Sequence, residues 1–209
     1  MAHKLPFHGE ISEQSVRTQI KNFLESDSKY ATAANVLLAM GAITGILFIG
    51  AVAPNLIQIF GSKRRKNKYT ESQIGNAIEN LNRNGFVKII NRGGKETEIL
   101  LTNEGKTRIK KYCFYDLKIK NQKKWDKKWR VVIFDIPINR NDARGALRRK
   151  IREIGFYKLQ DSVWIYPYPC EDEMLFVAHV FGIENCINVL TVERVLHEEK
   201  LRKIFKLNE

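Results

Sequence analysis

Residues 70–106, TESQIGNAIENLNRNGFVKIINRGGKETEILLTNEGK, decide how the middle of this chain folds. Thr70 opens a helix, and Gln73 stands three residues later, where a capping box requires its partner. The apolar residues then recur at helical spacing and form a buried face, which consists of Ile74, Ala77, Ile78 and Leu81. Asn84-Gly85 is a usual helix stop, so the pattern predicts a helix over residues 71–84.

Two strands and a second helix are predicted after this stop. Residues 86–91 form the first strand, residues 92–95 a tight basic glycine turn, and residues 96–102 the returning strand. A further helix begins at Asn103. This layout resembles the winged-helix DNA-binding domain, with "LNRNGFVKI" and "ILLTNEGK" as the most family-like phrases. The resemblance implies a winged-helix domain over residues 30–112.

The segment before this pattern, residues 30–62, contains no charged residue. We interpret residues 33–44 and 54–60 as the two apolar helices that a winged helix needs in front of its recognition helix. The alternative is an inner-membrane anchor through residues 33–60, because the apolar heart at 36–52 of the segment 36–60, extended slightly at each end, reaches the about 20 residues that cross a bilayer. The basic cluster after it would then stay in the cytoplasm.

Positive charge is confined to one third of the chain. Residues 63–130 hold 20 Lys/Arg and 7 Asp/Glu, which equals the whole net charge of +13, whereas residues 1–62 balance at 4 against 4 and residues 131–209 at 12 against 12. A charge concentrated in one window indicates a surface for a polyanion, and nucleic acid is the commonest such partner. The balanced C-terminal part is accordingly expected to be a scaffold and not a second nucleic-acid contact.

The predicted helix at 71–84 presents amides and one arginine on its outer face, namely Gln73, Asn76, Asn80 and Arg83. These side chains suit base edges in the major groove of double-stranded DNA. The expected phosphate contacts flank the helix at Lys63, Arg64, Arg65, Lys66 and Lys68, and at Arg92 and Lys95 in the turn. The simpler alternative for each of these residues is an ordinary solvated surface.

Three segments complete the organisation. Residues 1–29 are expected to form a polar N-terminal arm, and residues 113–128 a basic connector that either contacts nucleic acid or continues the preceding helix with its lysines solvated. The three cysteines are widely separated and form no pair, so neither disulfides nor zinc are indicated and a cytoplasmic location fits best.

Residues 129–209 predict a second domain. A strand at 131–134, a basic amphipathic helix at 139–154, strands at 157–159 and 162–166, a helix at 170–181 and a strand at 186–195 follow in order, with a short helix at 197–206. Strand–helix–strand–strand–helix–strand is the ferredoxin-like βαββαβ arrangement. The fold class predicted for the whole chain is therefore α+β.

The phrases "WRVVIFDIP", "ALRRKIREIGFYKLQDSVWIYPYPCEDE" and "FGI" resemble the central domain of the PaaX-like repressors of phenylacetate catabolism, a domain that is itself similar to the CRISPR-associated endonuclease Cas-two. The repressor resemblance implies a homodimeric DNA-binding transcriptional regulator with no cofactor. Full-length repressors carry a further C-terminal domain that is not seen here, which weakens the case for acyl-CoA sensing and leaves open whether an effector is sensed.

The nuclease resemblance implies a different function. In that family the aspartate that ends the first strand, here Asp135, meets its dimer mate and binds a divalent metal such as Mg²⁺, which activates water on RNA or DNA. The alternative is that Asp135 caps the turn into the helix at 139–154. Because no second acid, base or histidine stands beside Asp135 in the sequence, we favour the regulator over the metal-dependent endonuclease.

Overall fold

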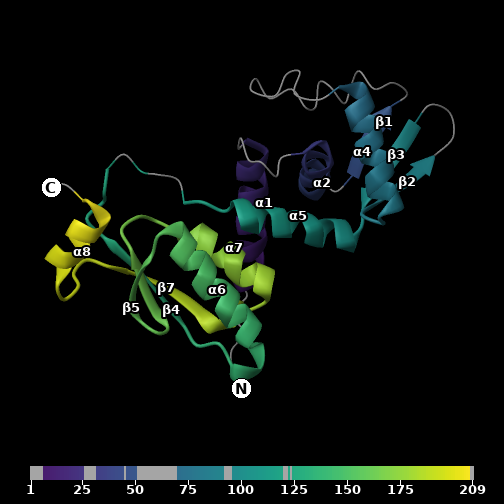
Figure 1. Ribbon diagram of the computed structural model, residues 1–209. Helices are drawn as coiled ribbons and strands as arrows, with labels where there is room; N and C mark the ends of the chain where they lie inside the picture. The colour runs from purple at the N-terminus through teal and green to yellow at the C-terminus, as the bar shows by residue number, and fades with distance from the viewer. Residues whose placement is uncertain are drawn as a thin grey trace. The chain divides into compact units, whose positions relative to one another are not determined.

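The computed structural model describes residues 7–25, 32–44, 46–50, 70–91, 96–119, 122 and 124–207, which form a mixed helix-and-sheet fold (Figure 1). The chain divides into two compact units. Val16–Asp116 form the N-terminal unit, and Leu117–Glu209 together with Met1–Ser15 form the C-terminal unit. Each is described by itself.

The segment expected to be a polar arm contains a helix, α1 (Phe7–Glu25). Its second half buries Val16, Ile20 and Phe23, which recur at a spacing of three and four residues. These apolar side chains are few among many polar ones, so the average composition of residues 1–29 conceals a helix that the spacing alone indicates.

The first predicted apolar helix is present as α2 (Ala33–Thr44), which buries Val36, Leu37 and Leu38 almost completely and packs against α4 and α5. A strand follows it, β1 (Ile46–Gly50), for which the sequence predicted no element. A uniformly apolar run lacks the alternation that separates strand from helix. The predicted helix at 54–60 lies outside the described residues. Across the residues that are described, no helix has the length and apolar character to cross a membrane.

The predicted recognition helix is α4 (Glu71–Arg83), which begins with the expected capping box. The Gln73 backbone N–H donates to Thr70 Oγ1 at 3.2 Å, and the Thr70 backbone N–H donates to Gln73 Oε1 at 2.8 Å. β2 (Val87–Asn91) and β3 (Glu96–Leu101) follow as an antiparallel hairpin. β3 also pairs antiparallel with β1, which gives a sheet in the order β1-β3-β2.

The helix predicted from Asn103 is α5 (Asn103–Asp116), with Ile109 and Cys113 buried. It runs into the segment expected to be a basic connector, so residues 113–116 are the end of a helix, and Leu117 directly after it is also buried. The start of the segment 113–128 therefore continues the preceding helix, which was one of the two alternatives for it.

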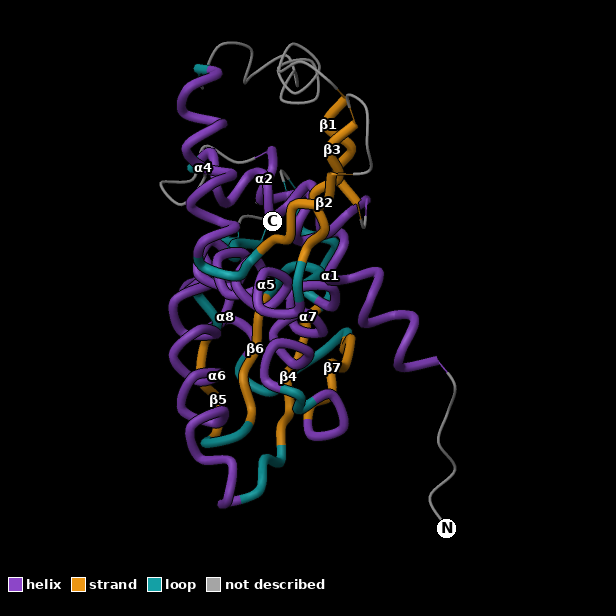
Figure 2. Tube along the Cα trace, turned by 90° about the vertical axis from the view of Figure 1, so that its right-hand side faces the viewer, coloured by secondary structure: helices purple, strands orange, loops and turns teal. Residues whose placement is uncertain are grey.

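The C-terminal unit contains its elements in the predicted order (Figure 2). They are β4 (Trp129–Phe134), η1 (Ile138–Arg140), α6 (Asn141–Ile154), β5 (Tyr157–Gln160), β6 (Val163–Tyr166), α7 (Glu171–Phe181), η2 (Glu184–Cys186), β7 (Ile187–Val192) and α8 (Glu198–Phe205). The four strands form one sheet in the order β5-β6-β4-β7, and every neighbouring pair is antiparallel.

This sheet packs on both faces. On one face, arginine side chains of α6 lie over the rings of Phe134 and Trp164. On the other, Trp129, Val131 and Ile165 form a buried cluster with Leu201 of α8. Residues of β4 alternate between the two, as the pleat of a strand requires.

The three thiols differ in access. Cys113 and Cys170 are buried, and burial raises the pKa of both thiols, whereas Cys186 is partly exposed. Because the thiolate is the reactive form, we expect an excess of a thiol reagent at pH 8 to label one cysteine quickly in the native chain and three after unfolding. Peptide mapping should place the fast label on Cys186, and rapid labelling of all three would contradict the buried cores described above.

Candidate nucleic-acid interface

The outer face of α4 is built by the alternation of its buried and exposed residues. Ile74 and Leu81 are buried, which turns the opposite side of the helix to solvent. All four side chains predicted to read bases, Gln73, Asn76, Asn80 and Arg83, are exposed. The residue pattern therefore places three amides and one guanidinium on one exposed helical surface.

The amides on this surface are not equally available. Gln73 Oε1 accepts from the Thr70 backbone in the capping box, and Asn80 Oδ1 accepts from Asn84 Nδ2 at 3.2 Å. For Asn76, which is exposed midway between these two side chains, the part of the chain that the structure describes shows no hydrogen bond of the amide. A bidentate contact to adenine uses both the oxygen and the nitrogen of an amide, so Asn76 is the residue best placed to make one.

The basic residues expected to flank α4 lie outside the described residues. These are Lys63, Arg64, Arg65, Lys66 and Lys68 before the helix, and Arg92 and Lys95 in the hairpin turn. The strands that carry the turn are in place, with Asn91 opposite Thr97 as their last pair.

Charge on α5 is partly used for packing. The Arg108 guanidinium lies 4.4 Å from the centre of the Phe86 ring and 5.3 Å from that of Tyr112, which is cation–π geometry. Lys106 and Lys111 of the same helix are exposed. The basic character of residues 106–116 thus serves both the fold and the surface.

Asp135 is exposed directly after β4, and its backbone N–H donates to the Cys186 carbonyl at 2.9 Å. The alternative role of Asp135 as a helix cap is wrong, because η1 intervenes and neither η1 nor α6 receives a side-chain cap. Within the described ranges, no group of three or more His, Cys, Asp or Glu residues is placed to hold a metal ion.

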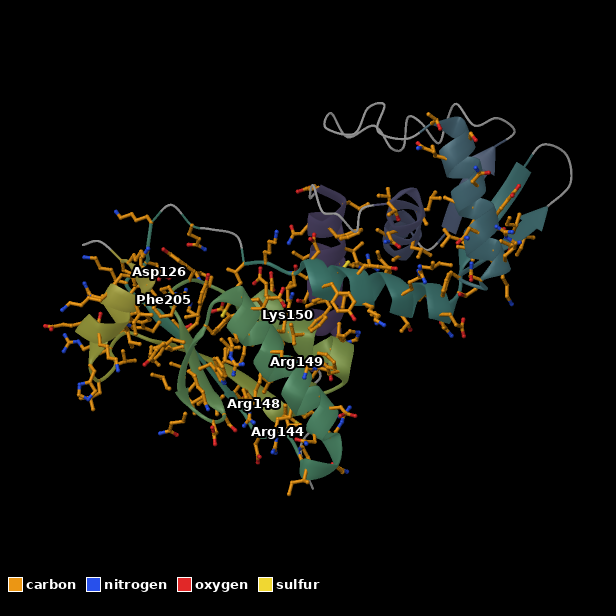
Figure 3. All side chains as sticks on the ribbon, viewed as in Figure 1. Asp126, Arg144, Arg148, Arg149, Lys150 and Phe205 are labelled. Atoms are coloured by element: carbon orange, nitrogen blue, oxygen red, sulfur yellow. The ribbon has the colours of Figure 1, made fainter. Side chains whose placement is uncertain are left out.

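The arginines of α6 were predicted only as the basic side of an amphipathic helix and were not considered as a site. Arg144, Arg148 and Arg152 recur every four residues along one flank of the helix, and Arg149 is exposed beside them. Figure 3 labels Arg144, Arg148 and Arg149 on this helix. The expected inward residues Ala143, Leu147 and Ile151 are buried as predicted. The missed signal was the distribution of charge between elements, because averaging over residues 131–209 gives zero.

A family model matches part of the chain. Residues 122–204 match the PaaX protein central Cas2-like domain, a range that begins just after α5 and ends in α8. No curated protein matches the chain. The matched range contains the whole four-stranded sheet, and the phrases that suggested the resemblance lie within it. The C-terminal unit of this chain therefore matches a PaaX-type central Cas2-like domain, which supports a relation to the PaaX-like family.

Proposed function

We propose that this protein is a DNA-binding transcriptional repressor that acts as a homodimer, with the N-terminal unit as a winged helix that reads double-stranded DNA. The observation that carries the proposal is the exposed amide face of α4, fixed by its capping box and followed by the β2–β3 hairpin. The order α2, β1, α4, β2, β3 and the sheet order β1-β3-β2 support a winged helix.

The family of the C-terminal unit supports a role in transcription regulation. The strand order β5-β6-β4-β7, with α6 after β4 and α7 after β6, supports a ferredoxin-like scaffold. In the proposed homodimer this scaffold sets the distance between two copies of α4. Two such helices bind half-sites about 34–36 Å apart, one turn of duplex DNA.

The proposal is tested by selecting binding sites from a random duplex library with the full chain. We expect enrichment of a pseudo-palindrome with half-sites about one helical turn apart. Light scattering of the complex should give two chains per duplex. Recovery of sequences no better than random would contradict sequence-specific reading, and a single chain on each duplex would contradict the homodimer.

Asn76→Ala tests whether α4 reads the DNA sequence. We expect the ratio of the affinities for selected and random duplex to fall about tenfold, because the variant loses one bidentate hydrogen-bond pair to a base. The affinity for random duplex should not change. Asn82→Ala is the matched control, since Asn82 is exposed on α4 but lies about 120° round the helix from Asn76. Competition binding measures both. Equal discrimination in the two variants would show that α4 does not read the sequence through this face.

Asp135 has no part in this proposal. Asp135→Asn is therefore expected to leave duplex binding unchanged. Incubating the recovered duplex, and RNA of the same sequence, with Mg²⁺ or Mn²⁺ provides the complementary check. Cleavage that disappears in Asp135→Asn would favour a metal-dependent endonuclease over the regulator.

A further inference from the structure

The C-terminal unit is neutral only on average. Between residues 131 and 209, the stretch 138–158 holds seven Lys/Arg and two Asp/Glu, a net charge of +5, and the remainder holds five against ten, a net charge of −5. The positive part is η1, α6 and the start of β5. The unit therefore has one basic element and an acidic remainder.

Main-chain carbonyls fix the arginines of this basic element. Arg140 Nη2 donates to the Phe181 carbonyl at 2.6 Å, Arg148 Nη2 donates to the Asp161 carbonyl at 3.0 Å, and Arg144 donates to the Ile136 carbonyl. Within the described part of the chain, none of these three guanidinium groups donates to a carboxylate. Uncharged carbonyls hold them in position, and Arg148 also interacts electrostatically with the Asp161 carboxylate.

Packing against aromatic rings orients two arginines of α6. Arg148 and Arg152 each lie with the guanidinium carbon 5.9 Å from an aromatic ring centre, over Phe134 and Trp164 respectively. Arg149 and Arg152 are exposed. The carboxylate nearest in sequence, Glu153, is engaged with Lys150 at 3.2 Å. The outer surface of α6 thus presents the guanidinium groups of Arg149 and Arg152 to solvent, and the second of these lies over the Trp164 ring.

Guanidinium groups held by uncharged carbonyls and aromatic rings suit phosphate oxygens, which accept two parallel N–H bonds from one guanidinium. Successive members of the row rise by about 6 Å along the helix. A linear ligand with regularly spaced phosphates matches such a row better than a single anion does.

We propose that α6 is a second DNA-contacting surface, which binds the phosphate backbone of the duplex without reading its sequence. This rests on the proposed function, since the duplex is the one that α4 reads. The C-terminal unit is then more than a scaffold, because it adds phosphate contacts through Arg149, Arg152 and their neighbours in the row. These contacts raise affinity for any duplex and leave discrimination between duplexes to α4.

The test compares two charge-matched variants of the full chain. Arg149→Gln with Arg152→Gln removes two exposed charges from α6, and Lys200→Gln with Lys203→Gln removes two exposed charges from α8. The dependence of log affinity on log salt is measured on a random-sequence duplex. We expect the slope to become shallower by about 0.9 for each phosphate that the α6 variant no longer neutralises, and to stay unchanged in the α8 variant. Arg149→Lys with Arg152→Lys should restore it.

The outcomes separate the two proposals. If the wild-type chain binds duplex and the two glutamine variants have equal slopes, the α6 surface is wrong and the role of α4 is untouched. If Asn76→Ala keeps full discrimination while the α6 variant has the shallower slope, the α6 surface stands and the reading role of α4 fails. A wild-type chain that binds no duplex overturns both.

Discussion

Gly105→Ala is expected to destabilise the N-terminal unit by about 3 kcal/mol, although alanine is the better helix former. A Cβ at this position would lie 2.2 Å from the Phe86 carbonyl oxygen and 2.6 Å from Leu101 Cδ1. Overpacking costs about 1–3 kcal/mol or more, and the upper end applies here because the nearest atom is main chain and cannot rotate away. The gain in helix propensity, about 1 kcal/mol, is smaller.

The environment of Gly105 explains why this approach is so close. The Thr102 hydroxyl donates to the Gly85 carbonyl at 2.7 Å and accepts from the Gly105 backbone N–H at 3.1 Å. The Thr102 backbone N–H donates to the Phe86 carbonyl at 3.1 Å. The first turn of α5 is thereby held against the residues that lead from α4 into β2, so a movement that relieved the clash would break these bonds.

Gly75→Ala is the matched control in α4. Gly75 is exposed and nothing lies within 4 Å of its added Cβ, so the same substitution should stabilise by about 0.5–1 kcal/mol. Hydrogen exchange of peptides from α4 and α5 follows this unit, whereas all three tryptophans, Trp125, Trp129 and Trp164, lie in the C-terminal unit and report on it by fluorescence. Equal protection in the two variants would contradict the close approach at Gly105.

The sequence predicted best the elements whose ends carry their own chemistry. Thr70 with Gln73 and Asn84-Gly85 bounded α4 to within one residue, since caps and left-handed stops act locally. β1 was not predictable in the same way, because its pairing with β3 joins residues about 50 positions apart and its own residues are uniformly apolar. Tertiary pairing, not local preference, decides such a segment.

The candidate site was also predictable only where local sequence patterns determine it. The exposed face of α4 follows directly from helical periodicity, which is why Asn76 and Arg83 were found. The unequal availability of Gln73 and Asn80 requires hydrogen-bond partners that spacing does not give. The helix at 139–154 was predicted to be basic, but its arginines were given no role, because acidic residues elsewhere in the same unit cancel their charge in a sum over the unit.

Asp126→Ala is expected to destabilise the C-terminal unit by about 3 kcal/mol. Arg130, whose side chain is 7% exposed, donates to both carboxylate oxygens of Asp126 at 2.8 and 2.7 Å, and its remaining carboxylate partner, Glu171, is at 3.4 Å. Removing one partner of a fully buried pair leaves an uncompensated charge and costs about 3–5 kcal/mol. The expected cost lies at or below the lower end, because the Asp126 side chain is 36% exposed and Glu171 stays in place.

The control is an exposed pair of the same chemistry. Asp161 contacts Lys158 at 2.6 Å, but both side chains are largely exposed, so Asp161→Ala should hardly change the urea midpoint of the tryptophan fluorescence transition. If Asp126→Ala and Asp161→Ala shifted the midpoint equally, burial of Arg130 would not be the source of the stability.

The dependence on pH gives an independent check of the same pair. The hydrogen bonds from Arg130 hold the pKa of Asp126 below its ordinary value of 3.8. A carboxylate whose pKa is lower in the folded state stabilises the fold above its unfolded pKa, about 3.9, and loses that contribution as pH falls through the folded pKa. The stability difference between wild type and Asp126→Asn should therefore be constant from pH 8 to pH 5 and shrink below pH 4. A difference that grew on acidification would mean that Asp126 acts through something other than its charge.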